Sequence, residues 1–138
     1  MGESSIVGMT ITDAVDLTEF TDRFVRVWNE PDSSTRSQLI RLLWAGNAVE
    51  YTNANEYRGH EALDLRVANA YGQFVQEGDF VFRLATEPAA HHAGVLVIVE
   101  MVPAAGGPPA WIGTVMAFLD AEGRIEREYQ FGRNLPAT

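Results

Sequence analysis

The spacing of the apolar residues changes once along this 138-residue chain, and the change restricts the folds that the chain can adopt. Before Gly78 the apolar residues recur every three or four positions, which is typical of one face of a helix. After Gly78 they alternate with other residues, which is typical of β-strands. Helices gathered in one half and strands in the other indicate an α+β fold with antiparallel strands.

Three helices are predicted in the first half. The first lies between residues 16 and 31, where Asp16 and Glu19 resemble a capping box and Pro31 ends the helix. Asp32 or Ser33 caps the second helix, which ends near residue 46, and the third lies between residues 59 and 78. A short strand at 48–53 separates the second helix from the third.

Four longer strands are predicted in the second half, at 80–84, 95–102, 111–119 and 124–131. Short Gly- and Pro-containing turns join them. We expect one strongly curved antiparallel sheet wrapped around the three N-terminal-half helices, which makes a cone with an apolar pocket at its mouth. Residues 1–14 are small, polar and aperiodic, so we expect a flexible tail followed by a single domain at 15–138.

Composition excludes several classes of function. The chain has no cysteine, which excludes disulfides, thiolate nucleophiles and cysteine metal sites. Its net charge is -9 and its 10 basic residues are scattered arginines, which argues against nucleic acid or an anionic membrane as a partner. We see neither an apolar run of about 20 residues nor a signal-peptide pattern, so we expect a cytoplasmic protein.

Three pieces of the sequence carry a resemblance to a known family. They are WNEPD at 28–32, LLWAGNAVEYTNANEYRGHEAL at 42–63 and GRIEREYQF at 123–131. With the order of elements, they resemble the nuclear transport factor 2-like (NTF2-like) superfamily and its SnoaL-like branch. That branch contains polyketide cyclases, and its wider relatives include ketosteroid isomerase, scytalone dehydratase and limonene epoxide hydrolase. The resemblance implies a cone fold around a small-molecule pocket, no metal or organic cofactor, and a homodimer.

A tyrosine and an asparagine on the first strand are candidate catalytic residues. Alternation puts Tyr51 and Asn53 on one face of the strand. The pair resembles the tyrosine and asparagine with which the limonene epoxide hydrolase branch holds a water. Tyr51 would donate a hydrogen bond and Asn53 would orient water or a carbonyl. The alternative is a core tyrosine and a turn asparagine. Gln130 stands where that branch has an aspartate, and an amide cannot act as a general base.

Two glutamates are candidate acid/base groups. Glu100 is the one charged residue in VLVIVEMV, a run that predicts a strand buried on both faces, and burial raises a carboxyl pKa. The alternative is that Glu100 pairs with a nearby arginine or lies at the sheet rim. Glu128 alternates with Gln130 on one face of the last strand, which would face the pocket or, alternatively, solvent or a dimer partner.

Aromatic residues and one histidine are candidate substrate-binding residues. We expect the pocket walls to include Trp28, Tyr71, Phe74 and Trp111, although each is also an ordinary core residue by composition. His60 at the start of the third helix would be neutral there, or would simply lie at the surface. The remaining histidines are adjacent on a strand and point to opposite faces, so we expect no metal site.

The favoured functional hypothesis is a cofactor-free acid/base cyclase, isomerase or hydrolase acting on an apolar or polyketide-like substrate. The alternatives are a non-catalytic ligand-binding or dimerisation module and, second, an epoxide hydrolase. Convergence of Tyr51, Asn53, Glu100 and Gln130 on one enclosed cavity would favour the enzyme. Scattered positions would favour the binding or structural module.

Overall fold

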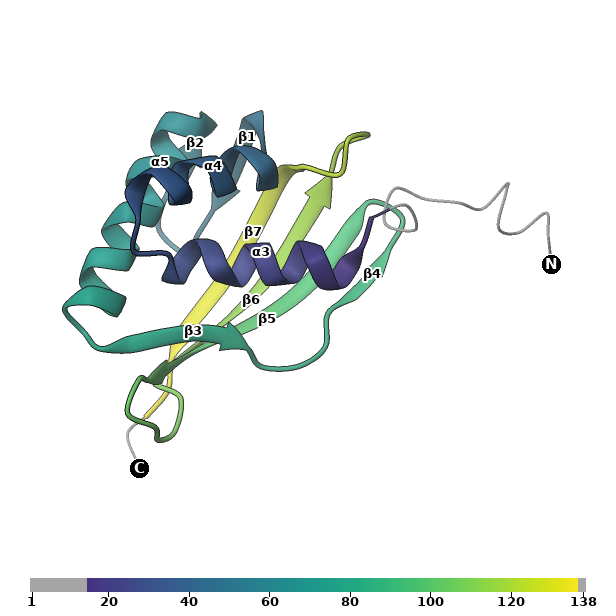
Figure 1. Ribbon diagram of the computed structural model, residues 1–138. Coiled ribbons are helices and arrows are strands. Elements are labelled where there is room, and N and C mark those ends of the chain that lie inside the picture. Colours follow the sequence, from purple (N-terminus) through teal and green to yellow (C-terminus); the bar gives the residue numbers. More distant parts are fainter. Residues whose placement is uncertain (1–14, 137–138) are drawn as a thin grey trace.

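The computed structural model describes residues 15–136, which form three α-helices packed on a seven-stranded sheet (Figure 1). The helices are α3 (Leu17–Asn29), α4 (Ser33–Leu43) and α5 (Gly59–Ala70), and α5 continues into a π-helical segment, η1 (Tyr71–Gln76). The predicted tail at 1–14 lies outside the described residues. No helix in the described part of the chain is long and apolar enough to cross a membrane.

The sheet has the strand order β2-β1-β7-β6-β5-β3, and β4 pairs with β5 beside β3. Its strands are β1 (Trp44–Tyr51), β2 (Glu56–Arg58), β3 (Phe80–Leu84), β4 (Ala89–His91), β5 (Gly94–Pro103), β6 (Trp111–Leu119) and β7 (Ile125–Asn134). The pairing of β1 with β7 is parallel, and the other pairings are antiparallel. The predicted α+β class is confirmed.

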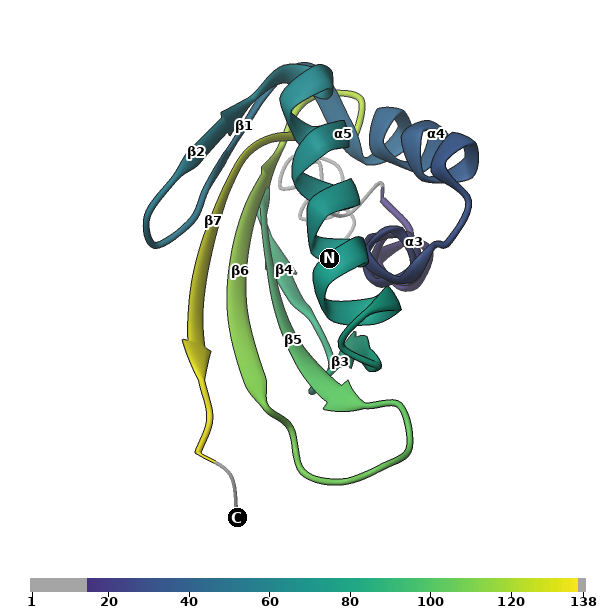
Figure 2. The same ribbon diagram turned by 90° about the vertical axis from the view of Figure 1, so that its left-hand side faces the viewer.

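The sheet is curved, and the three helices lie on its concave side (Figure 2). We call this concave side the inner face and the opposite side the outer face. The sheet extends from the β1–β2 hairpin at one edge to β3 at the other. Its curvature makes a cone, and the helices cover the hollow side of that cone. The predicted cone-shaped sheet around the helices is therefore confirmed.

The helix starts follow from capping aspartates. Asp16 Oδ1 accepts from the Glu19 backbone N–H at 3.0 Å, and Asp32 Oδ2 accepts from the Thr35 backbone N–H at 2.8 Å. Each aspartate thereby satisfies an N–H group that the first helical turn leaves without a partner. The predicted starts of the first two helices are confirmed.

The end of the second helix differs from the prediction. The helix was expected to continue to residue 46, but α4 ends at Leu43 and Trp44 begins β1. Trp44 pairs with Ile125 in β7, and its side chain is fully buried. Pairing with a distant strand therefore overrides the helical spacing of Ile40, Leu43 and Trp44.

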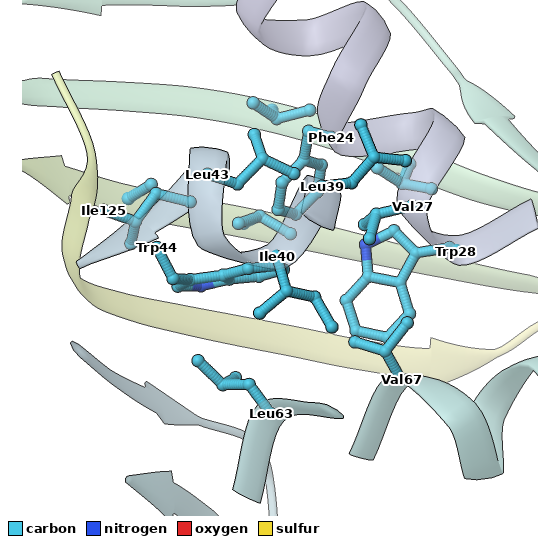
Figure 3. Packing of buried hydrophobic residues seen from close by; sticks show 14 of the residues in the cluster. Phe24, Val27, Trp28, Leu39, Ile40, Leu43, Trp44, Leu63, Val67 and Ile125 are labelled. Atoms are coloured by element: carbon cyan, nitrogen blue, oxygen red, sulfur yellow. The ribbon is translucent and has the colours of Figure 1, made fainter. Parts of the chain in front are cut away.

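The core lies between the helices and the inner face, and Figure 3 shows part of it. The rings of Phe24, Trp28 and Trp44 pack with centroids 6.0 to 6.3 Å apart. Ile40 and Leu43 of α4 and Leu63 of α5 close the same cluster (Figure 3). Because these side chains fill the closed end of the cone, the space that remains lies toward η1 and the far ends of β5, β6 and β7.

The fifth strand corrects a second prediction. We expected this run to be buried on both faces, but in β5 buried residues such as Val97 and Val99 alternate with partly exposed ones such as Ile98 and Glu100. The prediction is wrong because the helices cover the inner face alone. Glu100 therefore lies on the opposite side of the strand from Val99.

Candidate functional site

A cavity of about 150 Å³ lies between α3, α5, η1 and the inner face of the sheet. Its walls are mostly apolar. The aromatic wall residues are Phe24, Trp28, Phe74, Phe82 and Trp111, and the aliphatic ones are Ala70, Val99, Met101 and Val115. Three polar residues, Arg66, Gln130 and Asn134, complete the lining. A concave apolar site with a few placed polar groups is typical of small-molecule pockets.

Two glycines shape one wall of this cavity. Gly113 of β6 and Gly132 of β7 are direct neighbours across the strands. A Cβ atom at Gly132 would lie 2.7 Å from Cζ2 of Trp111, and one at Gly113 would also clash with the indole. The indole therefore lies flat over both strands because neither residue has a side chain. Its ring meets Phe82 edge-on at 6.2 Å between centroids.

Arg66 of α5 forms the polar end of the cavity. Its Nε donates to Glu50 Oε1 at 3.0 Å, and its Nη2 donates to Gln130 Oε1 at 3.3 Å. The guanidinium carbon lies 5.1 Å from the ring centroid of Trp28 and 5.2 Å from that of Tyr57. These contacts hold the planar group in one orientation, with 19% of the side chain exposed.

A buried pair of glutamates lies behind Arg66. Glu50 and Glu128 face each other in the parallel register of β1 and β7, and both are fully buried. Trp44 Nε1 donates to Glu128 Oε1 at 2.9 Å. The second oxygens, Glu50 Oε2 and Glu128 Oε2, have no donor among the described residues. A carboxyl group of this pair that held a proton would have a donor of its own to offer.

The surroundings of Glu128 favour its protonated form. Burial raises the pKa of Glu128 well above its usual range, and the charge of Glu50 and a hydrogen bond with Glu50 raise it further. The Trp44 donor and the positive charge of Arg66 lower the pKa of Glu128, but they are smaller influences. Glu50 is the member of the pair that contacts the guanidinium of Arg66.

A bulge in β7 brings Glu128 to the inner face. Phe118 of β6 pairs with Arg127, whereas the next residue, Leu119, pairs with Ile125. The extra residue, Glu126, is exposed. Ile125 and Glu128 are three positions apart and both fully buried, which strict alternation would not allow.

Four of the predicted site residues line the cavity: Trp28, Phe74, Trp111 and Gln130. Glu128 lies in the buried pair behind this wall rather than in it. Gln130 contacts Arg66, which we did not single out from the sequence. Of the four residues expected to converge on one cavity, Gln130 alone is in its wall.

Tyr51 and Asn53 do not line the cavity. Tyr51 follows Glu50 in β1 and stacks on Tyr129, with ring centroids 5.0 Å apart. Asn53 is exposed and bonds the backbone of Gly132, donating to its oxygen at 2.7 Å and accepting from its N–H at 3.3 Å. The expected pair on the pocket side is therefore not formed, because alternation turns Glu50 rather than Tyr51 to the inner face.

Glu100 also lies away from the cavity. Its Oε2 accepts from Arg83 Nε at 2.6 Å, and the side chains of Glu100 and Arg83 are 15% and 60% exposed. The two residues are direct neighbours in the β3–β5 register. This is the arginine pairing that the sequence left open as the alternative, and it leaves no carboxylate of β5 in the cavity wall.

The last two candidates have structural contacts. Tyr71 packs against the Arg36 guanidinium, whose carbon lies 4.9 Å from the ring centroid. His60 Nε2 lies 2.7 Å from the backbone oxygen of Trp44 and connects the start of α5 to β1. Neither lines the cavity. Within residues 15–136, no three His, Asp or Glu side chains form a cluster that could hold a metal ion.

Glu50 and Arg66 are the site residues that sequence reasoning missed. A signal exists for each. Glu50 shares the even-numbered face of β1 with Trp44 and Ala48, both fully buried. Arg66 follows Leu63 by three positions in α5, at the edge of the buried stripe. A charged residue on a buried face is the informative observation in both cases.

Comparison with known proteins finds similarity in structure rather than in sequence. No protein-family model matches the chain, and no curated protein matches it. A SnoaL-like family protein from Agrobacterium tumefaciens, for which isomerase activity has been suggested, superposes with a TM-score of 0.76. The two chains are 22% identical, and the match covers 85% of this chain and 97% of that one.

Two further solved structures are also similar in fold to this chain. A Sinorhizobium meliloti protein for which polyketide cyclase activity has been suggested gives a TM-score of 0.61 at 17% identity, covering 88% of this chain and 99% of that one. An NTF2-like protein of unknown function from an Exiguobacterium species gives 0.58 at 21% identity, covering 86% and 99%. The fold that the sequence resemblance implied is confirmed: residues 15–136 have the cone-shaped α+β fold of NTF2-like and SnoaL-like proteins.

Proposed function

We propose that the chain binds a small, largely apolar molecule of about one ring in the cavity between α5, η1 and the inner face. The observation that carries the proposal is an apolar wall with one polar end, made by Arg66 and Gln130. A dry cavity of about 150 Å³ in another protein holds benzene, which sets the size of the ligand. A polycyclic molecule would project from a cavity of this volume.

Binding without catalysis is better supported than acid/base catalysis by a residue of the wall. Among the described residues, the lining contains neither a carboxylate nor a histidine. The amide of Gln130 cannot take up a proton as a general base. Glu50, which lies behind the wall residue Arg66, forms an ion pair with that arginine. The wall therefore supports recognition of a ligand more directly than proton transfer.

The cavity can be tested with toluene as the probe and a variant that fills the space. Val115→Phe adds a ring to the wall, whereas Thr114→Phe adds the same ring to the outer face of the same strand. Toluene should shift the indole N–H resonances of Trp28 and Trp111 in the wild type and in Thr114→Phe, but not in Val115→Phe. A wild type without shifts, or shifts that Val115→Phe leaves intact, would contradict the proposal.

A second candidate function is proton transfer in the same cavity, as in the isomerase and cyclase activities suggested for two structural neighbours. The observation that favours it is the Glu50–Glu128 pair, which connects to the cavity through Arg66. A proton leaving the α-carbon of a bound ketone would pass to an ionised carboxylate of this pair, and the ketone oxygen near Arg66 would gain the negative charge.

Deuterium exchange tests this second candidate. In D₂O the wild type should speed α-hydrogen exchange of cyclohexanone above the buffer rate. Glu128→Gln, which has no titratable proton at this position, should lose the acceleration while still binding the ketone. Exchange at the buffer rate in the wild type would leave binding as the function of the cavity.

A homodimer formed through the outer face and a cytoplasmic location remain proposals. The outer face offers one supporting observation, because the large apolar side chain of Phe131 in β7 is 63% exposed. Sedimentation of the wild type and of Phe131→Ser would test the dimer, since loss of an interface residue should shift the equilibrium toward monomer.

A further inference from the structure

The charges around the cavity point to the class of ligand, on the condition that the cavity binds a small molecule as proposed above. Arg66 brings one positive charge to the polar end, and Glu50 neutralises it at 3.0 Å. If Glu128 keeps its proton, the group of three residues is neutral overall. If Glu128 were ionised, the group would carry one negative charge. In neither state does the polar end hold a positive charge left over for an anion.

Most of the unpartnered hydrogen-bonding groups of Arg66 and Gln130 are donors. Gln130 Oε1 already accepts from Arg66 Nη2, so its Nε2 has two N–H groups for which the described residues supply no acceptor. Arg66 has five N–H groups, and two of them have partners, Glu50 and Gln130. A ligand atom that accepts a hydrogen bond therefore finds more partners at this end of the cavity than one that donates. Donors that a bound ligand covers without accepting from them would cost free energy.

We infer that the ligand is a neutral one-ring molecule whose oxygen only accepts hydrogen bonds, such as a cyclic ketone or lactone, and that a carboxylate of the same size is rejected. Its ring lies against Trp28 and Trp111, and its oxygen lies at the Arg66–Gln130 end. Glu50 sets this preference, because it cancels the charge with which Arg66 would attract a carboxylate. Glu50 is thus a specificity-determining residue that does not itself line the cavity.

Three probes of nearly equal size separate the possibilities. Cyclohexanone has an accepting oxygen, methylenecyclohexane replaces that oxygen with a carbon, and cyclobutanecarboxylate, which has as many non-hydrogen atoms as the other two, is an anion at pH 7. Binding is followed by the indole N–H resonances of the full chain. Trp28 and Trp111 are in the wall and should shift, whereas Trp44 is outside it and serves as an internal control.

The Gln130→Met variant identifies the hydrogen bond. Methionine keeps the length of the side chain and removes its N–H donors. Methylenecyclohexane is more hydrophobic than the ketone, so the change in affinity between wild type and variant, rather than the affinity itself, is the deciding quantity. Loss of one hydrogen bond should weaken cyclohexanone about three- to tenfold and leave methylenecyclohexane within about twofold.

Each outcome decides between the inference and the function on which it rests. Ketone binding that weakens selectively in Gln130→Met, with no carboxylate binding, supports the inference. Carboxylate binding as tight as that of the ketone, or an equal response of ketone and alkene to Gln130→Met, overturns the inference and leaves the proposed binding function standing. If none of the three probes shifts Trp28 or Trp111 in the wild type, the binding function itself fails, and the inference fails with it.

Discussion

The two faces of the sheet each hold a glutamate–arginine ion pair, and the pairs differ in burial far more than in distance. On the outer face Glu100 and Arg83 approach to 2.6 Å, and the arginine side chain is 60% exposed. On the inner face Glu50 and Arg66 are 3.0 Å apart, with the glutamate fully buried and the arginine 19% exposed. We expect the shorter contact to be the weaker one, because water reaches its largely exposed arginine and screens the pair.

Burial determines how much stability is lost when one residue of an ion pair is removed. An exposed ion pair contributes at most about 1 kcal/mol, so either residue of the outer pair can be lost at little cost. A buried charge that loses its partner keeps its desolvation penalty. The inner pair therefore fixes the position of Arg66 at the cavity, whereas the outer pair does little more than occupy the surface.

The largest expected effect comes from Glu50→Gln. The substitution keeps the shape of the side chain and removes the negative charge that pairs with Arg66. We expect the free energy of unfolding to fall by about 3–5 kcal/mol, as for other buried pairs that lose one partner. Urea denaturation of the variant measures this change, and a loss below about 1 kcal/mol would place the inner pair in the same class as exposed pairs.

An intermediate effect, dependent on pH, is expected of Glu128→Gln. The pKa of Glu128 is raised in the folded protein, so the folded state holds this proton more tightly than the unfolded chain. The stability that the proton provides is full below the ordinary value of 4.5 and is lost as the pH rises toward the raised pKa. The variant does not lose stability in this way as the pH rises, because glutamine can accept from Trp44 and donate to Glu50 at any pH.

The measurement is the difference in free energy of unfolding between Glu128→Gln and the wild type, followed upward from pH 4.5. The difference should move in favour of the variant by up to about 1.4 kcal/mol per pH unit. A difference that stays constant with pH would mean that Glu128 does not hold a proton in the folded state.

The smallest effect is expected of Glu100→Gln on the outer face. Its partner Arg83 is largely exposed and returns to water when the ion pair is lost. The free energy of unfolding should change by less than about 1 kcal/mol, and binding of cyclohexanone should not change. A Glu100→Gln loss as large as that of Glu50→Gln would remove the distinction between the two faces.

Much of the fold could be predicted from local patterns. The start of α3 follows from the Asp16 cap, and the bounds of β6 follow from alternation, because both depend on residues that are neighbours in sequence. The start of β1 could not be predicted in this way. Trp44 fits the helical stripe of α4 as well as it fits a strand, and its pairing with Ile125 decides between them.

The candidate site was less predictable because it is assembled from distant segments. Glu50, Arg66 and Gln130 come from three elements, and their contacts depend on which face of each strand is covered. Glu100 was misjudged because its run of β-branched neighbours also suits a strand covered on one side. Glu128 reaches the inner face through a bulge at Glu126, which changes the alternation on which sequence reasoning depends.

The central claim is that a neutral ring occupies the cavity with its oxygen at the Arg66–Gln130 end. A crystal structure of the wild-type protein with cyclohexanone tests it most directly. The account predicts the ring between Trp28 and Trp111, with the ketone oxygen within hydrogen-bonding distance of Arg66 or of Gln130 Nε2. A cavity left empty at saturating ketone, or a ketone oxygen directed toward Asn134 and away from Arg66 and Gln130, would contradict it.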